Sequence, residues 1–286
     1  MQPGELEIVR RAYAMQVMAA AGVEDARVET AFAAVPREHF LGPGPWPILR
    51  RRGPAPRYAT TPSADPVYLY INNVIGILPE RNLNNGEPSL HAALIAAAAP
   101  QAGEHVVHVG AGVGYYTAIL AELAGASGRV TAIELDPGLA ARAAANFRQA
   151  PNVRVVEGDG TRIGFDPADL IYVNAGATRP ADPWLDRLNE GGRLILPLTA
   201  QGFPGGDARR GAVFRIARRG ADFLARRISA VAIFPCAGGR GEASERALAE
   251  ALDKGGAEHV ARLYRRDDLP AEQCWLRAPG WCLAYR

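Results

Sequence analysis

The sequence predicts an α/β protein: a doubly wound, mostly parallel sheet of seven strands, with N-terminal helices and a C-terminal extension. Two observations predict this fold. From about residue 101, short apolar runs alternate with helical patterns, as in parallel sheets covered by helices on both faces. The run HVVHV at 105–109 then breaks into glycines before a helical pattern begins, which is the form of a ligand-binding turn.

Apolar periodicity and turn residues place the elements along the chain. Helices are expected at 5–21, 25–34, 88–99, 115–124, 137–149, 182–189 and 242–252. Strands are expected at 105–109, 129–134, 153–156, 169–174 and 192–197, and β-like runs at 212–217 and 224–234 close one edge of the sheet. Residues 42–66 are rich in Pro, Gly and Arg and are expected to form a long irregular loop.

Composition excludes several classes of protein. Of 286 residues, 48% are hydrophobic and 22% charged, which is typical of a globular chain, and a net charge of +2 favours neither a nucleic-acid nor a membrane partner. The three cysteines, Cys236, Cys274 and Cys282, form no CxxC pair. They predict a reducing compartment and neither a metal site nor a disulfide framework. With no signal-like or bilayer-spanning run, we expect a cytoplasmic protein.

Three features follow successive strands and predict one ligand crevice. Gly110, Gly112 and Gly114 follow the first strand, in a G-x-G-x-G spacing that differs from the dinucleotide fingerprint G-x-G-x-x-G. Glu134 ends the next strand, about 20 residues on, where an acid can accept both ribose hydroxyls. Asp159 of VEGDG follows the third strand, beside the position of an adenine. The carboxyl ends of successive parallel strands meet at one sheet edge, where such ligands bind.

Several of these segments together resemble the protein-L-isoaspartate O-methyltransferases. The similar segments are VVHVGAGVGYYTAILAELAG, VTAIE, NVRVVEGDG, DLIYVNAGA, LDRLNEGGRLILPL, VEDARVETAFAAVPREHF and AIFPCAG. The resemblance spans about residues 5–239. It implies a Rossmann-like class I methyltransferase fold, S-adenosylmethionine as methyl donor, and a protein or peptide substrate.

The resemblance also divides the chain and assigns cofactor residues. Residues 1–100 would carry helices and a substrate loop of the catalytic domain, 101–239 the cofactor-binding core, and 240–286 an extension. The residues implied to contact the cofactor are His91, Gly110, Ala111, Gly112, Gly114, Tyr115, Glu134, Leu135, Asp159, Gly160 and Asn174. His91 is open to a second interpretation, as a helix N-terminal histidine packed against the sheet.

The substrate loop NLNNGEPSLHA departs from the family pattern. Gly86 stands where the family has a serine, Glu87 replaces a neutral residue, and Asn84 and Asn85 are the nearest side-chain donors. His108 stands where the family has a glutamate. We expect residues 84–87 to hold the substrate, in an Asn-Gly turn that leads into a helix.

The leading hypothesis is a carboxyl O-methyltransferase. A carboxylate is ionised at neutral pH and needs no general base, so alignment of the reacting atoms would be the main contribution of the enzyme. An alcohol or amine acceptor would need a base, for which Glu87 and His91 are candidates. Two alternatives stay open: tailoring of a peptide natural product or small molecule, and a non-catalytic interaction module. We expect Trp275 and Trp281 to cover the core and not to form a docking surface.

Overall fold

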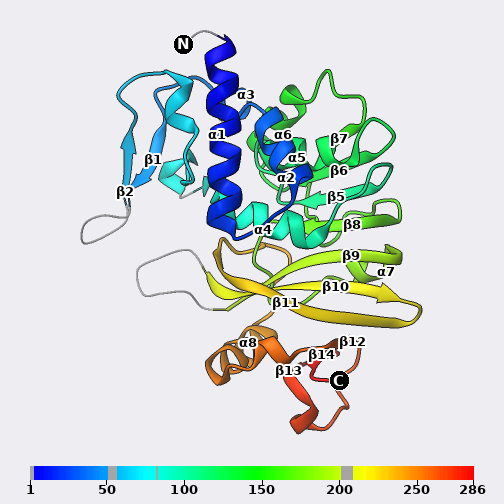
Figure 1. The fold of residues 1–286 in the computed structure, drawn as a ribbon. Helices are drawn as coiled ribbons and strands as arrows, with labels where there is room; N and C mark the ends of the chain where they lie inside the picture. Colours follow the sequence, from blue (N-terminus) through cyan, green and yellow to red (C-terminus); the bar gives the residue numbers. More distant parts are fainter. Residues whose placement is uncertain (1–2, 51–56, 82, 201–208) are drawn as a thin grey trace.

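The computed structural model describes residues 3–50, 57–81, 83–200 and 209–286. Its main sheet, as described, orders its strands β13-β14-β12-β11-β10-β9-β8-β5-β6-β7 (Figure 1). The seven predicted strands are β5 (His105–Val109), β6 (Arg129–Glu134), β7 (Val153–Glu157), β8 (Ala168–Val173), β9 (Leu188–Thr199), β10 (Arg209–Arg219) and β11 (Asp222–Ile233). The predicted α/β fold is confirmed, and three further strands continue the sheet.

The parallel part of the sheet reverses its strand order at β5. β5 pairs in parallel with both β6 and β8, and the chain moves outward from it in both directions. β10 pairs antiparallel with β9 and with β11. A reversal of this kind leaves a crevice at the carboxyl ends of the central strands, because the connecting loops diverge there.

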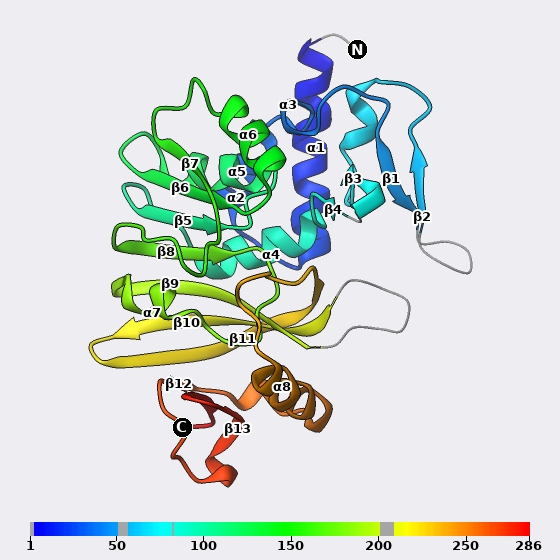
Figure 2. The same cartoon turned by 180° about the vertical axis from the view of Figure 1, so that it is seen from behind.

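Helices cover both faces of the sheet (Figures 1 and 2). One face packs against α1 (Pro3–Ala21), α2 (Ala26–Ala34), α4 (Pro88–Ala98), α5 (Tyr115–Ala124) and α6 (Pro137–Asn146). The other packs against α7 (Asp182–Asp186), α8 (Glu242–Lys254) and the C-terminal strands. The short helices are α3 (Glu38–Leu41), η1 (Pro66–Leu69), η2 (Pro79–Arg81), η3 (Ala257–His259) and η4 (Ala271–Gln273). No helix in the described ranges has the length and apolarity of a membrane span.

β5 shows why the central strands read as unbroken apolar runs. Val106 belongs to the core on the side of α1 and α4, whereas Val107 belongs to the core on the opposite side. Both are fully buried. Successive side chains of a strand point to opposite faces, so a strand covered on both faces needs apolar residues at consecutive positions.

The predicted irregular loop at 42–66 is partly wrong. β1 (Pro47–Arg50) pairs antiparallel with β2 (Arg57–Thr60), and β3 (Gly76–Leu78) pairs with β4 (Leu83–Asn84) further along the chain. Trp46 and Ile48 are buried in a small separate core that β1 shares with η1. This local core gives the β1–β2 pair an apolar partner that the composition of the segment does not suggest. Residues 51–56 of the predicted loop lie outside the described ranges.

Two predicted helices are too long at their C-terminal ends. The helix predicted at 137–149 ends at Asn146, because Phe147 leaves the helical backbone conformation and is buried in the core. The helix predicted at 182–189 ends at Asp186. Leu188 already belongs to β9, where it pairs with Ala168 and is 1% exposed. Pairing in the sheet therefore prevails over the helical pattern at this position.

The C-terminal extension continues both the sheet and the core. β12 (Arg262–Tyr264), β13 (Cys274–Ala278) and β14 (Trp281–Ala284) follow β11 in the sheet, and Figure 1 shows them at the end of the molecule opposite the N-terminus. Trp275 packs against Phe214 of β10, with ring centroids 5.4 Å apart. Trp275 and Trp281 are 3% and 2% exposed, which confirms that they cover the core. The division into three domains stays a prediction.

We predict that Trp275→Ala lowers the free energy of unfolding by about 3–5 kcal/mol, the usual cost of removing a large buried aromatic side chain. Its indole also donates to Gly255 O at 2.9 Å, a bond that the variant loses. Urea unfolding measures the change. Met15→Ala is the control, because that side chain is 61% exposed. Equal stability of the two variants would show that the extension does not share the core.

Candidate active site

A cavity of about 1090 Å³ opens at the carboxyl ends of β5, β6 and β7. Its walls come from the glycine loop after β5, the 83–87 loop, α4 and the end of β11. The predicted site residues that line it are Asn84, Asn85, Gly86, Glu87, His91, Gly110, Ala111, Gly112, Tyr115, Glu134, Leu135, Asp159, Gly160 and Asn174. The structure thus brings together residues from five separate segments of the chain.

The glycine loop approaches neighbouring backbone closely. Gly110 has φ +77°, and a Cβ there would lie 3.1 Å from the carbonyl oxygen of Asn174. The Asn174 amide donates back to Gly110 O at 3.3 Å. Gly112 has φ +58° and open space beside it. These positions favour glycine for its backbone freedom, and the space at Gly112 leaves its backbone accessible to a ligand.

Glu134 holds this loop to the end of β6. Its carboxylate accepts from the Gly112 N–H at 2.7 Å through Oε2, and from the Asp136 N–H at 2.9 Å through Oε1. The residue is 8% exposed and lines the cavity. Each carboxylate oxygen has a second lone pair, so both oxygens can still accept from a ligand hydroxyl.

The third glycine and its neighbour have packing roles. A Cβ at Gly114 would lie 2.4 Å from the Phe147 ring, so this glycine lets α5 approach the end of α6. Gly114 does not line the described cavity. The Tyr115 ring does, while its hydroxyl lies 3.5 Å from that of Tyr13. Leu135 is 48% exposed, at the mouth of the cavity.

Asp159 lies at the far end of the cavity, after β7. Its Oδ1 accepts from the Thr161 N–H at 2.9 Å and from the Thr161 hydroxyl at 2.7 Å, and Oδ2 pairs with Arg162 at 3.4 Å. A Cβ at Gly238 would lie 2.0 Å from Asp159 Oδ2, so the backbone after β11 closes directly over the carboxylate. Gly160, next in the chain, packs against Val109.

His91 is buried and also lines the cavity, so both interpretations of it agree with the geometry. It is 1% exposed, stacks on Tyr116 with ring centroids 3.6 Å apart, and its Nδ1 lies 2.7 Å from the Tyr172 hydroxyl. Burial lowers its pKa to about 3, and the nearby His108 adds to the shift. His91 is therefore neutral at physiological pH.

The 84–87 loop is held by its own asparagines. Asn84 Oδ1 accepts from the Gly86 N–H at 2.9 Å, and Asn85 Oδ1 accepts from the Ile75 N–H at 2.9 Å. Gly86 has φ +74°, and a Cβ there would lie 2.4 Å from His91 Nε2. A serine at 86 would thus require His91 to move. Asn85 is 6% exposed, and its buried Nδ2 has no hydrogen-bond partner in the described structure.

Sequence reasoning missed three parts of the site. Tyr116 and Tyr172 position His91 from α5 and β8, and the segment 230–238 at the end of β11 lines the cavity. The segment AIFPCAG carried a signal for the last of these, through its resemblance to the closing family motif. Tyr172 gave no such signal, because it lies 81 residues from His91 in the chain.

The fold and this crevice define a class I S-adenosylmethionine-dependent methyltransferase. Three properties of the chain fit that cofactor: glycine backbone at Gly110 and Gly112 where a ligand can lie close, the Glu134 carboxylate for ribose hydroxyls, and the Asp159 carboxylate for an exocyclic amine. The polar groups meet at the strand-order reversal, as expected for a nucleoside site.

Comparison with known proteins gives the family. Residues 56–232 match the family model for protein-L-isoaspartate(D-aspartate) O-methyltransferase (PCMT). A protein-L-isoaspartate O-methyltransferase of Anaeromyxobacter dehalogenans strain 2CP-1 is 34% identical over 70% of this chain and 83% of its own length. One of Methanoregula boonei is 34% identical over 80% of this chain and 92% of its own. The chain belongs to this family and is an S-adenosylmethionine-dependent O-methyltransferase.

Solved structures agree on the fold. A protein-L-isoaspartate O-methyltransferase superposes with a TM-score of 0.64 at 23% identity, over 85% of this chain and 69% of the other. A Plasmodium falciparum protein, described as a putative member of the family in complex with S-adenosyl-L-homocysteine, gives 0.61 at 17% identity, over 79% and 97% of the two chains. Both support the fold that the strand order defines.

We predict that His108 makes stability fall with falling pH. Burial lowers its pKa from 6.5 to about 3. Between these values the unfolded chain binds a proton that the folded chain does not, so stability is lost as pH falls through this window. In His108→Asn, the unfolding free energy should depend less on pH, by about 1.4 kcal/mol per pH unit between about pH 4 and 6.

Urea unfolding across that pH range, compared between the wild type and the variant, isolates the contribution of His108. The control is His259→Asn, because the side chain of His259 is 73% exposed and solvated in the folded protein. If the wild type and His108→Asn have equal slopes, His108 takes up its proton in the folded state and is not held neutral by burial.

Proposed function

We propose that this enzyme methylates a carboxylate of a protein or peptide, with an isoaspartyl side chain as the first candidate acceptor. The observation that carries the proposal is Asn85 Nδ2, a buried amide donor at the cavity wall without a partner. A buried donor that lacks a partner is costly, and a small rotation of the Asn85 side chain toward the cavity would let a ligand oxygen accept from it. A carboxylate supplies such an oxygen and is already ionised.

The proposed cofactor contacts follow the cavity from Asp159 to His91. Asp159 and Gly160 would flank the adenine, Glu134 would accept from the ribose hydroxyls, and the backbone of residues 110–112 would face the methionine part. S-adenosylmethionine supplies an activated methyl group when bound. The protein therefore needs to hold the acceptor oxygen in line and to exclude water.

The ionisation of the site favours an acceptor that needs no base. A general base works best when its pKa lies near the operating pH, and the pKa of His91 is lowered to about 3 by burial. Its Nδ1 is also engaged by Tyr172. Glu87, the N-cap residue of α4, remains a candidate base for an alcohol or amine acceptor. A carboxylate acceptor would make that role unnecessary.

A second candidate function uses the same methyl donor with a different peptide as the acceptor. Gly86 removes the hydroxyl that the family carries at this position, and His91 occupies the space of its side chain. The acceptor pocket therefore differs from that of a typical isoaspartyl enzyme. This difference favours a carboxylate of a peptide natural product as the alternative acceptor.

We infer a cytoplasmic location for this enzyme. Cys236, Cys274 and Cys282 are all buried and unbridged. Free thiols persist most readily in reducing compartments, and repair of protein carboxylates would place the enzyme beside newly made and ageing proteins.

Mass spectrometry of three peptide substrates separates these candidates. The peptides share one sequence and carry isoaspartate, aspartate or only a C-terminal carboxylate. Addition of one methyl group to the isoaspartyl peptide alone supports the repair activity. Methylation of another carboxylate supports the second candidate. Cofactor binding with no methylated product, even from a wider peptide library, would contradict the proposal of a peptide carboxylate as acceptor.

We predict that Glu134→Gln weakens binding of S-adenosylhomocysteine by about 10- to 100-fold, because charge-assisted hydrogen bonds to hydroxyls exceed neutral ones. Isothermal titration calorimetry measures the change. Glu157→Gln is a matched control, since Glu157 is the register partner of Glu134 on β7 and lies outside the described cavity lining. Equal affinities of the two variants would place the ribose elsewhere.

We predict that Asn85→Asp lowers kcat/KM for the methylated peptide about 100-fold and leaves S-adenosylhomocysteine affinity within about twofold. The aspartate keeps an oxygen for the Ile75 N–H but replaces the free donor with a charge that repels a carboxylate. Asn152→Asp is the control, because Asn152 donates to Gly125 O outside the described cavity lining. Unchanged kcat/KM in Asn85→Asp would remove this residue from the acceptor site.

A further inference from the structure

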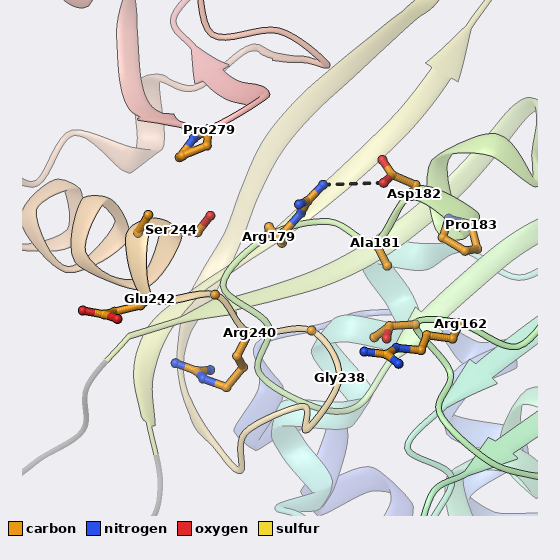
Figure 3. A pocket seen from close by; sticks show the side chains of 14 residues that line it. Arg162, Arg179, Ala181, Asp182, Pro183, Gly238, Arg240, Glu242, Ser244 and Pro279 are labelled. Carbon is orange, nitrogen blue, oxygen red and sulfur yellow. Dashed lines mark ion pairs between the residues drawn. The ribbon is translucent and has the colours of Figure 1, made fainter.

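A second cavity, of about 410 Å³, lies between the methyltransferase core and the C-terminal extension (Figure 3). The residues that line it are Thr161, Arg162, Arg179, Ala181, Asp182, Pro183, Gly238, Gly239, Arg240, Gly241, Glu242, Ala243, Ser244 and Pro279. The family match ends at residue 232, so one wall of this cavity belongs to a segment beyond it. The extension therefore creates a pocket that the family match does not account for.

The N-terminus of α8 forms that wall. Gly241 is the N-cap and provides no side-chain cap, although its own N–H donates to Thr178 Oγ1 at 2.9 Å. The N–H groups of the following residues, 242–244, have no intrahelical acceptor by their position in the first turn. α8 has 13 residues, so its aligned peptide dipoles give this end a partial positive charge that attracts anions.

Ser244 gives an independent indication of a ligand. It is 6% exposed, and within the described ranges its hydroxyl makes no hydrogen bond. Figure 3 shows this side chain on the side of α8 that faces Arg179 and the cavity. The hydroxyl oxygen itself remains open to the cavity, because it is not among the buried side-chain atoms that lack a partner in the described structure. It can therefore bond directly to an oxygen of a bound group.

Arginines surround the cavity in excess over acids. Arg162 and Arg179 are 83% and 44% exposed at its rim and make long pairs of 3.4 Å and 3.6 Å with Asp159 and Asp182. Asp182 is also paired with Arg265 at 3.3 Å. The remaining acid in the lining, Glu242, has a 95% exposed side chain that is turned to solvent. Two exposed guanidinium groups at the rim are thus within reach of an anion.

Arg240 completes the floor of the pocket. It donates to Gly176 O at 2.8 Å and to Thr199 O at 3.0 Å, and it pairs with Glu245 at 2.9 Å. These bonds fix the turn between β11 and α8, so the first turn of α8 is held against the core. The site is therefore built before a ligand arrives, with Ser244 on one side and the two rim arginines on the other.

We propose that this cavity binds a small oxyanion, a phosphate or a carboxylate, between the first turn of α8, Ser244 and the side chains of Arg162 and Arg179. Both chemistries offer the acceptor oxygens that N–H groups, a hydroxyl and guanidinium groups require. The source is either a free anion or an acidic peptide segment. The core and the extension each contribute to the site, so its occupant joins the two.

Occupancy of the oxyanion site is coupled to the cofactor cavity. Arg162 pairs with Asp159, and Gly238 lines both cavities, with its Cβ position 2.0 Å from Asp159 Oδ2. An anion that draws Arg162 away changes the charge beside Asp159. Linkage makes the effect reciprocal. This coupling rests on the proposed cofactor contacts, whereas oxyanion binding itself does not.

Titration calorimetry with sodium phosphate and with a tetraglutamate peptide tests the site. Ser244→Ala and Arg179→Gln should each weaken binding about tenfold. Ser127→Ala and Arg154→Gln, outside the described lining, should leave it unchanged. Binding of phosphate supports a free anion, and binding of the peptide alone supports an acidic segment. Failure of both probes to bind, or equal binding by all four variants, overturns the proposal.

The coupling is measured separately, as the dissociation constant of S-adenosylhomocysteine with and without saturating phosphate or peptide. We expect a shift of about fivefold or more in the wild type and none in Arg162→Gln. A wild type without a shift overturns the coupling. If the anion binds but S-adenosylhomocysteine does not, the cofactor contacts fail and the oxyanion site stands. If S-adenosylhomocysteine binds but neither anion does, the proposed oxyanion site is wrong and the cofactor contacts stand.

Discussion

The site depends on the carboxylate of Glu134, which fastens the glycine loop to the end of β6. Two backbone N–H groups, of Gly112 and Asp136, converge on its two oxygens at 2.7 and 2.9 Å. The carboxylate is 8% exposed, and these bonds compensate for its burial. One side chain thereby sets the shape of the loop after β5 and the direction of the turn after β6. The same oxygens keep lone pairs for a ligand, so the group that organises the crevice also faces it.

The other walls of the crevice pack closely around the loop that Glu134 holds in place. Gly110 lies against the Asn174 carbonyl, Gly160 against Val109, and Gly238 against Asp159, at distances where a Cβ would collide. Each of these glycines lets backbone from a different strand end approach a neighbour closely, so main-chain groups form part of the wall. A wall of this kind presents N–H and C=O groups at fixed positions.

The sequence correctly predicted those helices and strands whose ends are set by local residue patterns. β5, β6 and α5 have their predicted bounds, because apolar runs and glycines end at the same residues as the elements. β12 has three residues and is a strand only because β14 and β11 flank it. The pocket at α8 likewise depends on where the extension packs. The unpartnered amide of Asn85 could not be foreseen, because burial and the absence of a partner are properties of the folded chain.

The histidine behind the 84–87 loop explains why a glycine stands at position 86, where the resemblance places a serine. His91 is fixed from two sides, by stacking on Tyr116 and by the Tyr172 hydroxyl, and its Nε2 occupies the space that a side chain at 86 would need. Moving it would break a buried contact with no replacement partner in the same place. The loop therefore turns at Gly86 with φ +74° and leaves Asn85 as the buried donor at the wall. In the acceptor site proposed above, the side-chain donor would therefore be the Asn85 amide, one residue before the position where the resemblance places a serine hydroxyl.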